Sequence, residues 1–147
     1  MNKIVKVYLD TNILIDYITR QNNIVEAVNY LFQKRRKEVL FTSSLAIAQT
    51  LCNLQKKKKT RSAFTKEQAV QVVDFYLKKL TILDLTKADI EKAKTENGND
   101  MEDCIQRAVS KKKKCDAILT RNTSDFSNFD DVKIISPKIA FLKQLIN

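Results

Sequence analysis

Short apolar runs recur along the chain, and longer amphipathic stretches with helical spacing separate them. The runs are rich in β-branched and aliphatic residues and stop at polar residues, as the strands of a buried sheet do. They cover residues 3–9, 39–42, 80–85, 115–120 and 132–135. One or two predicted helices follow each run, because apolar positions return there every three or four residues. Strands joined through helices form right-handed crossovers, so the pattern predicts a three-layer α/β/α sandwich with a mostly parallel sheet of about five strands.

Several of the predicted helices have recognisable ends. Thr65 and Gln68 have the spacing of a capping box, which places a helix start there. Gly98, the only glycine, is expected to be the C-cap after the short helix over 86–95. Three residues of that helix are expected to face the core: Ala88, Ile90 and Ala93.

The chain has the length of one ordinary domain, and nothing in its composition divides it. Of its 147 residues, 44% are hydrophobic and 30% are charged, which is typical of a folded domain rather than a disordered one. No internal repeat is present. We therefore expect a single domain over residues 1–147.

Positive charge is in clear excess. Lys and Arg number 27 against 17 Asp and Glu, which gives a formal net charge of +10. Such a surface attracts polyanions, so nucleic acid is the expected partner. The alternative is a lysine-rich surface without a dedicated ligand, and the location of the acids decides between the two. The basic segment over 56–61 is expected to be a solvated helix end and loop, with contact to phosphates as the second interpretation.

Scarce or missing residue types exclude several kinds of site. The chain has no histidine, which excludes histidine-based ribonuclease chemistry and Ser-His or Cys-His nucleophiles. One glycine cannot build a P-loop or a G-x-G-x-x-G dinucleotide turn. The three cysteines form no C-x-x-C pair, so neither a disulfide framework nor a zinc knuckle is indicated. Without a signal-peptide pattern or an apolar run of about 18 residues, the expectation is a cytoplasmic protein with no membrane contact.

Four aspartates follow elements that a parallel sheet brings to one edge. Asp10 ends the first strand and Asp125 follows the fourth, while Asp100 and Asp103 lie three residues apart near a helix start. In open α/β sheets the carboxyl ends of the strands face the crevice where ligands bind. Gathered carboxylates repel one another unless cations lie among them, and hard oxygen ligands suit Mg²⁺ or Mn²⁺. Two such ions, about 3.5–4 Å apart, would support hydrolysis of a phosphodiester.

Each of these acids also has a purely structural interpretation. Asp100 can be a helix N-cap, and Asp103 can be a first-turn acid that the helix dipole favours. Asp125 can cap the turn that it opens, and Asp10 can bond the backbone of its own turn. Four acids in order around a predicted crevice nevertheless favour a metal site. Other aspartates are interpreted as surface or turn residues: Asp16, Asp74, Asp84, Asp116, Asp130 and Asp131.

The segments around these acids resemble the motifs of PIN-domain nucleases across nearly the whole chain. They are V-Y-L-D-T-N-I-L-I-D at 7–16, D-M-E-D-C-I-Q-R-A at 100–108 and D-A-I-L-T-R-N-T-S-D-F at 116–126, with a closing S-P near the last helix. The order is similar to that of bacterial VapC-type toxins. The resemblance implies a Mg²⁺- or Mn²⁺-dependent endoribonuclease that acts on RNA, is often a homodimer and is frequently inhibited by a small antitoxin.

The same resemblance implies roles for individual residues. The catalytic and metal-binding acids are Asp10, Asp100, Asp103 and Asp125. Polar neighbours are expected to orient ligands or phosphate: Thr11, Asn12, Gln49, Thr120, Arg121 and Asn122.

Gln49 departs from the pattern, because most toxins of the family have a glutamate at this place. An amide contributes no charge, so a second metal ion would be held more weakly. This leaves open a catalytically weak or inactive PIN-like module that binds RNA or protein. A third alternative, phosphotransfer through an Asp10 nucleophile as in haloacid-dehalogenase-like enzymes, expects an aspartate where this chain has Asn12.

Overall fold

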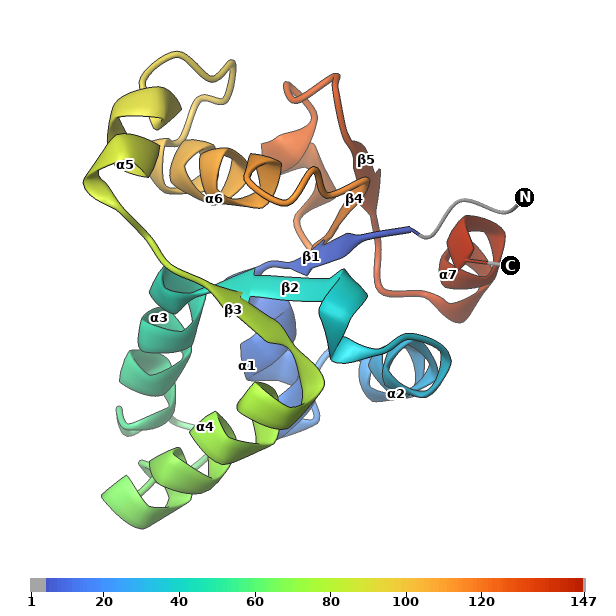
Figure 1. Ribbon diagram of the computed structural model, residues 1–147. Coiled ribbons are helices and arrows are strands. Elements are labelled where there is room, and N and C mark those ends of the chain that lie inside the picture. Colours follow the sequence, from blue (N-terminus) through green and yellow to red (C-terminus); the bar gives the residue numbers. More distant parts are fainter. Residues whose placement is uncertain (1–4, 147) are drawn as a thin grey trace.

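The computed structural model describes residues 5–146, and five strands form its central sheet (Figure 1). The strands are β1 (Val7–Leu9), β2 (Leu40–Ser43), β3 (Thr81–Leu83), β4 (Ala117–Leu119) and β5 (Lys133–Ile135). Their order is β3-β2-β1-β4-β5, and all neighbouring pairs are parallel. The predicted sheet is confirmed, although the expected start of the first strand at Lys3 and Ile4 lies outside the described residues.

Helices cover both faces of the sheet, which confirms the three-layer α/β/α architecture (Figure 1). One face carries α5 (Lys87–Ala93) and α6 (Met101–Lys111). The other carries α1 (Thr11–Thr19), α2 (Val25–Lys34), α3 (Ser44–Leu54), α4 (Lys66–Lys79) and α7 (Ile139–Ile146). The 3-10 helix η1 (Lys37–Val39) precedes β2, and η2 (Thr123–Phe126) follows β4.

The side chains of β1 alternate between two apolar cores, one on each face of the sheet. Val7 and Leu9 pack with apolar residues of α1, α2, α3, α4 and α7. Tyr8 packs instead with residues of α5 and α6, and its hydroxyl lies within hydrogen-bond distance of Ser43 Oγ, at 2.8 Å, and of Gln106 Oε1, at 3.0 Å. Because both faces of the strand are covered, all three positions are fully buried.

Helix α5 differs from its prediction. Ala93 is buried as expected, but Ala88 and Ile90 are exposed, so their predicted inward orientation is wrong. The buried position is Asp89, which closes a capping box with Thr86. Apolar spacing alone did not show that a hydrogen-bonded acid, rather than an aliphatic residue, would face the core here.

The predicted C-cap role of Gly98 is also wrong. No glycine in the described chain has a positive φ, and α5 ends at Lys94 with an ordinary helical conformation. Gly98 is small for a packing reason instead. A Cβ atom there would lie 2.7 Å from Phe129 Cζ and 2.9 Å from Cys104 Sγ, so the loop that leads into α6 could not lie so close to these side chains.

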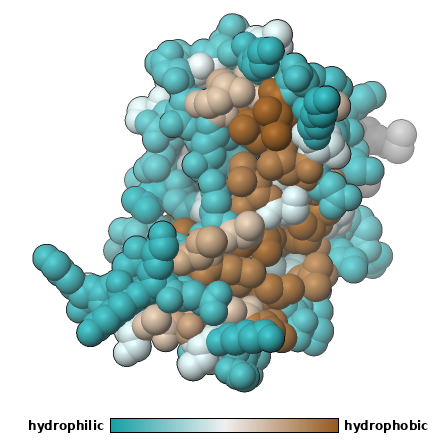
Figure 2. Space-filling model, turned by 90° about the vertical axis from the view of Figure 1, so that its left-hand side faces the viewer, coloured by the Kyte–Doolittle hydropathy of each residue, from teal (hydrophilic) through white to brown (hydrophobic). Residues whose placement is uncertain are grey.

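The surface has a broad apolar band on the side that carries α3, α4 and α5 (Figure 2). Val70 and Leu77 on α4 and Ile90 on α5 are large hydrophobic residues with about half of their surface exposed. No helix within residues 5–146 combines the length and hydropathy that crossing a bilayer requires. The three cysteines are free, Cys52 exposed and Cys104 and Cys115 buried.

Candidate metal centre

Asp10 lies where β1 ends and α1 begins, and its carboxylate is almost completely buried. Its backbone NH still continues the sheet, donating to Leu119 O of β4 at 3.0 Å. Its Oδ1 accepts from Thr11 N at 2.7 Å and from Gln106 Nε2 at 2.8 Å. Its Oδ2 accepts from Thr120 Oγ1 at 2.8 Å and from Asn12 Nδ2 at 3.1 Å. These four donors come from three separate parts of the chain, so the fold fixes this carboxylate firmly.

Burial raises the pKa of Asp10, although the hydrogen bonds from Thr120 and Gln106 act in the opposite direction. None of the described residues forms an ion pair with it. A buried carboxylate without a cationic partner is energetically costly, because the low-dielectric surroundings destabilise its charge.

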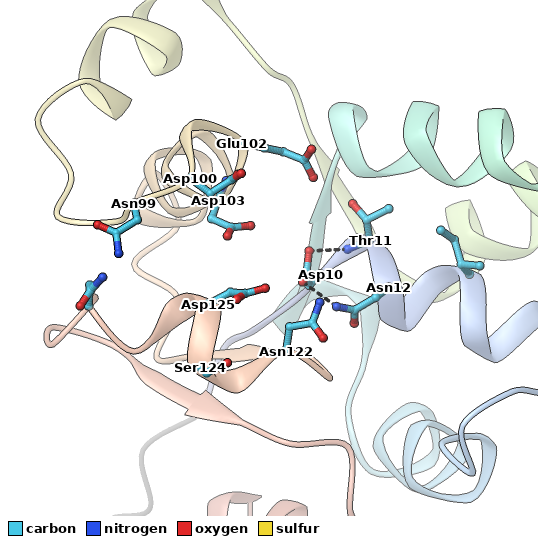
Figure 3. Close-up of a pocket in the computed structure, with 12 residues that line it drawn as sticks. Asp10, Thr11, Asn12, Asn99, Asp100, Glu102, Asp103, Asn122, Ser124 and Asp125 are labelled. Atoms are coloured by element: carbon cyan, nitrogen blue, oxygen red, sulfur yellow. Dashed lines mark hydrogen bonds between the residues drawn. The ribbon is translucent and has the colours of Figure 1, made fainter.

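A pocket of about 470 Å³ opens in front of Asp10, and all four predicted acids line it. Figure 3 shows the carboxylates of Asp103 and Asp125 directed toward the space beside Asp10, with Asp100 at the far rim. None of the lining residues is basic. The topology explains the arrangement, since β1 and β4 are parallel neighbours and the start of α6 lies over the same edge of the sheet.

Asp100 and Asp103 occupy the first turn of α6 in different ways. Asp100 is the N-cap, and its Oδ1 accepts from Asp103 N at 3.1 Å, so its capping interpretation is correct and leaves Oδ2 available. Burial, followed by the charges of Asp100, Asp10, Asp125 and Glu102, raises the pKa of Asp103 to about 7. This repulsion shows that the carboxylates are close enough to affect one another in the absence of cations.

The predicted orienting residues lie in two places. Thr11, Asn12 and Asn122 line the pocket itself. Thr120 is buried behind it, where its hydroxyl bonds Asp10 and accepts from Asn122 N at 3.1 Å.

Gln49 does not line the pocket. It lies on α3 behind Thr11, whose hydroxyl donates to Gln49 Oε1 at 2.8 Å. The amide therefore acts on the site only through Thr11.

The interpretation of Asp16 as a surface or turn residue is wrong. It is buried on α1, where its Oδ2 accepts from Arg121 Nε at 2.8 Å and from Asn22 Nδ2 at 2.9 Å. Arg121 also donates its backbone NH to Asn12 Oδ1 at 3.1 Å. Arg121 lies outside the acidic pocket and lines a neighbouring one.

Two residues of the site are not among those predicted from the sequence. Gln106 is a fully buried amide on α6 that joins Asp10 to Tyr8. Glu102 is a fifth carboxylate of the pocket, beside Asp103 and directed into the space between α6 and Thr11 (Figure 3). It stands inside the D-M-E-D motif, of which only the two aspartates are predicted metal ligands.

The donor set suits a hard divalent cation, because it consists of carboxylate, amide and hydroxyl oxygens with no competing lysine or arginine. Within residues 5–146, no three histidine, cysteine or acidic side chains are already arranged as a complete ligand cluster. The carboxylates instead face one another across an open pocket. A cation between them would relieve the repulsion that raises the pKa of Asp103.

The family model described as PIN domain matches residues 7–132. The chain belongs to the PIN domain family. The matched region includes β1, α6 and β4, and with them all the acids of the pocket. A search of curated proteins found no significant match.

Several solved structures share this fold at low sequence identity. A VapBC complex bound to DNA from Salmonella typhimurium superposes with a TM-score of 0.68 and 15% identity, covering 92% of this chain and 100% of the other. VapBC2 from Rickettsia felis, bound to a promoter DNA fragment, gives 0.64 and 18%, covering 90% and 98%. Mycobacterium tuberculosis VapC20, described as a sarcin-ricin loop cleaving toxin, gives 0.64 and 18%, covering 87% and 98%.

Proposed function

We propose that this PIN-domain protein is a Mg²⁺- or Mn²⁺-dependent endoribonuclease that hydrolyses single-stranded or structured RNA. One observation carries the proposal: five carboxylates line a single pocket that contains no basic side chain, and one of them, Asp10, is buried without an ionic partner among residues 5–146. The net charge of +10 adds a surface that attracts a polyanionic substrate.

The position of each pocket residue indicates its role in the proposed reaction. Asp10 is the fixed ligand, because four hydrogen bonds hold its carboxylate. Asp103 and Asp125 are the ligands that face it, with Asp100 at the rim. Divalent ions held by these carboxylates would supply an activated water and charge stabilisation for the leaving oxygen. The Asn122 amide and the Ser124 hydroxyl line the same pocket and can hold a phosphate oxygen in place.

The structural relatives suggest a biological setting. Several of them are toxin–antitoxin complexes, so we propose that this chain is a cytoplasmic toxin with a cognate antitoxin. The apolar band over α3, α4 and α5 supports a protein partner, because exposed apolar patches of this kind mark interaction surfaces. A homodimer stays a prediction, which light scattering of the purified chain would check.

The test is cleavage of single-stranded RNA with Mn²⁺ or Mg²⁺ by the native chain, Asp103→Asn and Asp74→Asn. Asp103 is chosen over Asp10 because it is only partly buried, so its replacement leaves the fold intact. The exposed Asp74 on α4 is a matched control for loss of one carboxylate. We expect a loss of roughly 100-fold or more for Asp103→Asn and none for Asp74→Asn. Equal activity in all three, or no metal-dependent product from the native chain, would remove the proposal.

A second candidate is a non-catalytic module that binds RNA, which the amide at Gln49 favours. It predicts an affinity for RNA that falls steeply with salt, without any metal-dependent cleavage product. The cleavage assay therefore separates the two functions directly.

A further inference from the structure

A second pocket, of about 260 Å³, adjoins the acidic one and has the opposite charge. The two share Asn12 and Ile15 of α1 as a common wall. The second pocket is lined by three cations, Lys58, Arg61 and Arg121. The volume is below that of a typical drug-binding site, and it suits one phosphate with its sugar rather than a large ligand.

The charge of this pocket is not cancelled by its own acid. Asp16 is the single acid among the lining residues, and Arg121 Nε already engages it. That contact fixes the plane of the guanidinium. Among residues 5–146, no hydrogen bond uses the two terminal NH₂ groups of Arg121, so they remain able to donate in the fork geometry that phosphate oxygens accept.

The other two cations are held by the loop after α3. Arg61 donates to Leu54 O at 3.1 Å and to Asn53 O at 3.2 Å, so its positive charge covers the C-terminal end of that helix. Lys58 N donates to Arg61 O at 3.1 Å, which closes the loop and fixes the backbone of Lys58 beside the pocket. The Lys58 side chain is exposed and has no hydrogen bond or ion pair with a described residue.

We propose that this basic pocket, formed by Lys58, Arg61 and Arg121, is a subsite for a backbone phosphate of single-stranded RNA next to the one that is cleaved. The inference rests on the proposed nuclease function. It answers a physical difficulty of that function, because an acidic pocket repels a polyanion until cations bind. A fixed positive pocket across a shared wall holds the neighbouring phosphate of the same strand independently of metal.

The experiment measures binding without catalysis. Fluorescence anisotropy follows a labelled single-stranded RNA with 2′-O-methyl riboses, which cannot be cleaved, in EDTA and over a range of KCl concentrations. The variants are Lys58→Glu and the flanking controls Lys57→Glu and Lys59→Glu. All three lysines are exposed in the same loop, but only Lys58 lines the pocket.

We expect Lys58→Glu to weaken binding about tenfold and to reduce the slope of log K against log[KCl] by about 0.7, the contribution of one phosphate contact. The two controls are expected to change the affinity less than threefold. Inorganic phosphate at millimolar concentration should compete with the RNA for the native chain, and it should compete less for Lys58→Glu. This result would show that the subsite binds the phosphate group itself. Equal weakening by all three variants would overturn the proposal, because it would reduce the effect to general surface charge.

The outcome is distinguishable from failure of the nuclease proposal. Binding differences without any metal-dependent cleavage would retain the subsite and remove the activity. Cleavage without a difference among the three lysine variants would do the reverse.

Discussion

Asp10 and Asp89 are both buried acids at the start of a helix, yet their surroundings shift their pKa values in opposite directions. Burial alone would raise the pKa of Asp89, but Lys112 Nζ donates to its carboxylate at 2.7 Å and the pKa is lowered instead. Asp10 has four neutral donors and no cationic partner in the part of the chain that the structure describes, and its pKa is raised. Asp16, the third buried acid of the described chain, resembles Asp89, because it pairs with Arg121.

The two regions differ in whether the charge of a buried carboxylate is compensated within the chain. The two buried carboxylates of the described chain that lie outside the acidic pocket each form an ion pair, Asp89 with Lys112 and Asp16 with Arg121, so their charges are compensated within the chain. At Asp10, neutral hydrogen-bond donors orient the carboxylate but do not compensate its charge. The acids that face it add further negative charge. The missing positive charge is the strongest sign that a cation from solution belongs in this pocket.

The largest effect is expected when the ion pair between Lys112 and Asp89 is broken. Lys112→Met leaves the carboxylate of Asp89 buried without its partner, which should destabilise the protein by about 2 kcal/mol at pH 7, since the lysine side chain is a third exposed. Chemical denaturation measures the loss. An acid with a lowered native pKa stabilises the fold above its unfolded pKa of about 3.9 and loses that contribution as pH falls. The destabilisation should therefore shrink below about pH 4, and an unchanged value there would contradict the assignment.

A smaller effect is expected in the acidic pocket, where replacing Asp103 should stabilise the metal-free protein rather than destabilise it. The pKa of Asp103 is about 7 in the native state and about 3.9 unfolded, so the metal-free protein loses stability as pH rises from about 4 to about 7. Asp103→Asn removes the repulsion. Because Asp103 is partly exposed and salt screens the repulsion, only part of the difference in pKa appears as stability, so the melting temperature of Asp103→Asn in EDTA at pH 8 should exceed that of the native chain by roughly 2–4 °C. The two should nearly coincide at pH 4, whereas the same difference at both pH values would argue against mutual repulsion.

The smallest effect sharpens the role of the amide behind Thr11. Gln49→Glu adds a negative charge outside the pocket while an oxygen acceptor for the Thr11 hydroxyl is kept. We expect Mn²⁺-dependent cleavage to rise roughly threefold, which is less than 1 kcal/mol. Gln49→Met, which has similar size but neither charge nor acceptor, is the matched control. A tenfold loss in Gln49→Glu would show that the neutral amide itself is required.

The sequence predicted those features that depend on topology. Alternating strands and helices determine which strand ends meet, so the placement of Asp10 and Asp125 at one edge followed from their positions after β1 and β4. The capping box at Thr65 and Gln68 is local in the chain, and it too was predictable and is present.

Features that depend on distant partners were not predictable. Asp16 occupies a helix position that resembles many solvated ones, and its partner Arg121 is 105 residues away. Gln106 carries no charge and belongs to no recognised spacing, although it bonds Asp10 directly. The small size of Gly98 serves contacts with Phe129 and Cys104, which no turn motif reveals.

We propose that a divalent cation supplies the positive charge that the chain does not place in the pocket of Asp10. Isothermal titration calorimetry with Mn²⁺ at pH 7.5 tests it most directly, with the native chain, Asp103→Asn and the control Asp74→Asn. We predict saturable binding to the native chain and the control, and affinity at least tenfold weaker in Asp103→Asn. Absence of binding to the native chain, or equal affinity in all three proteins, would contradict the account.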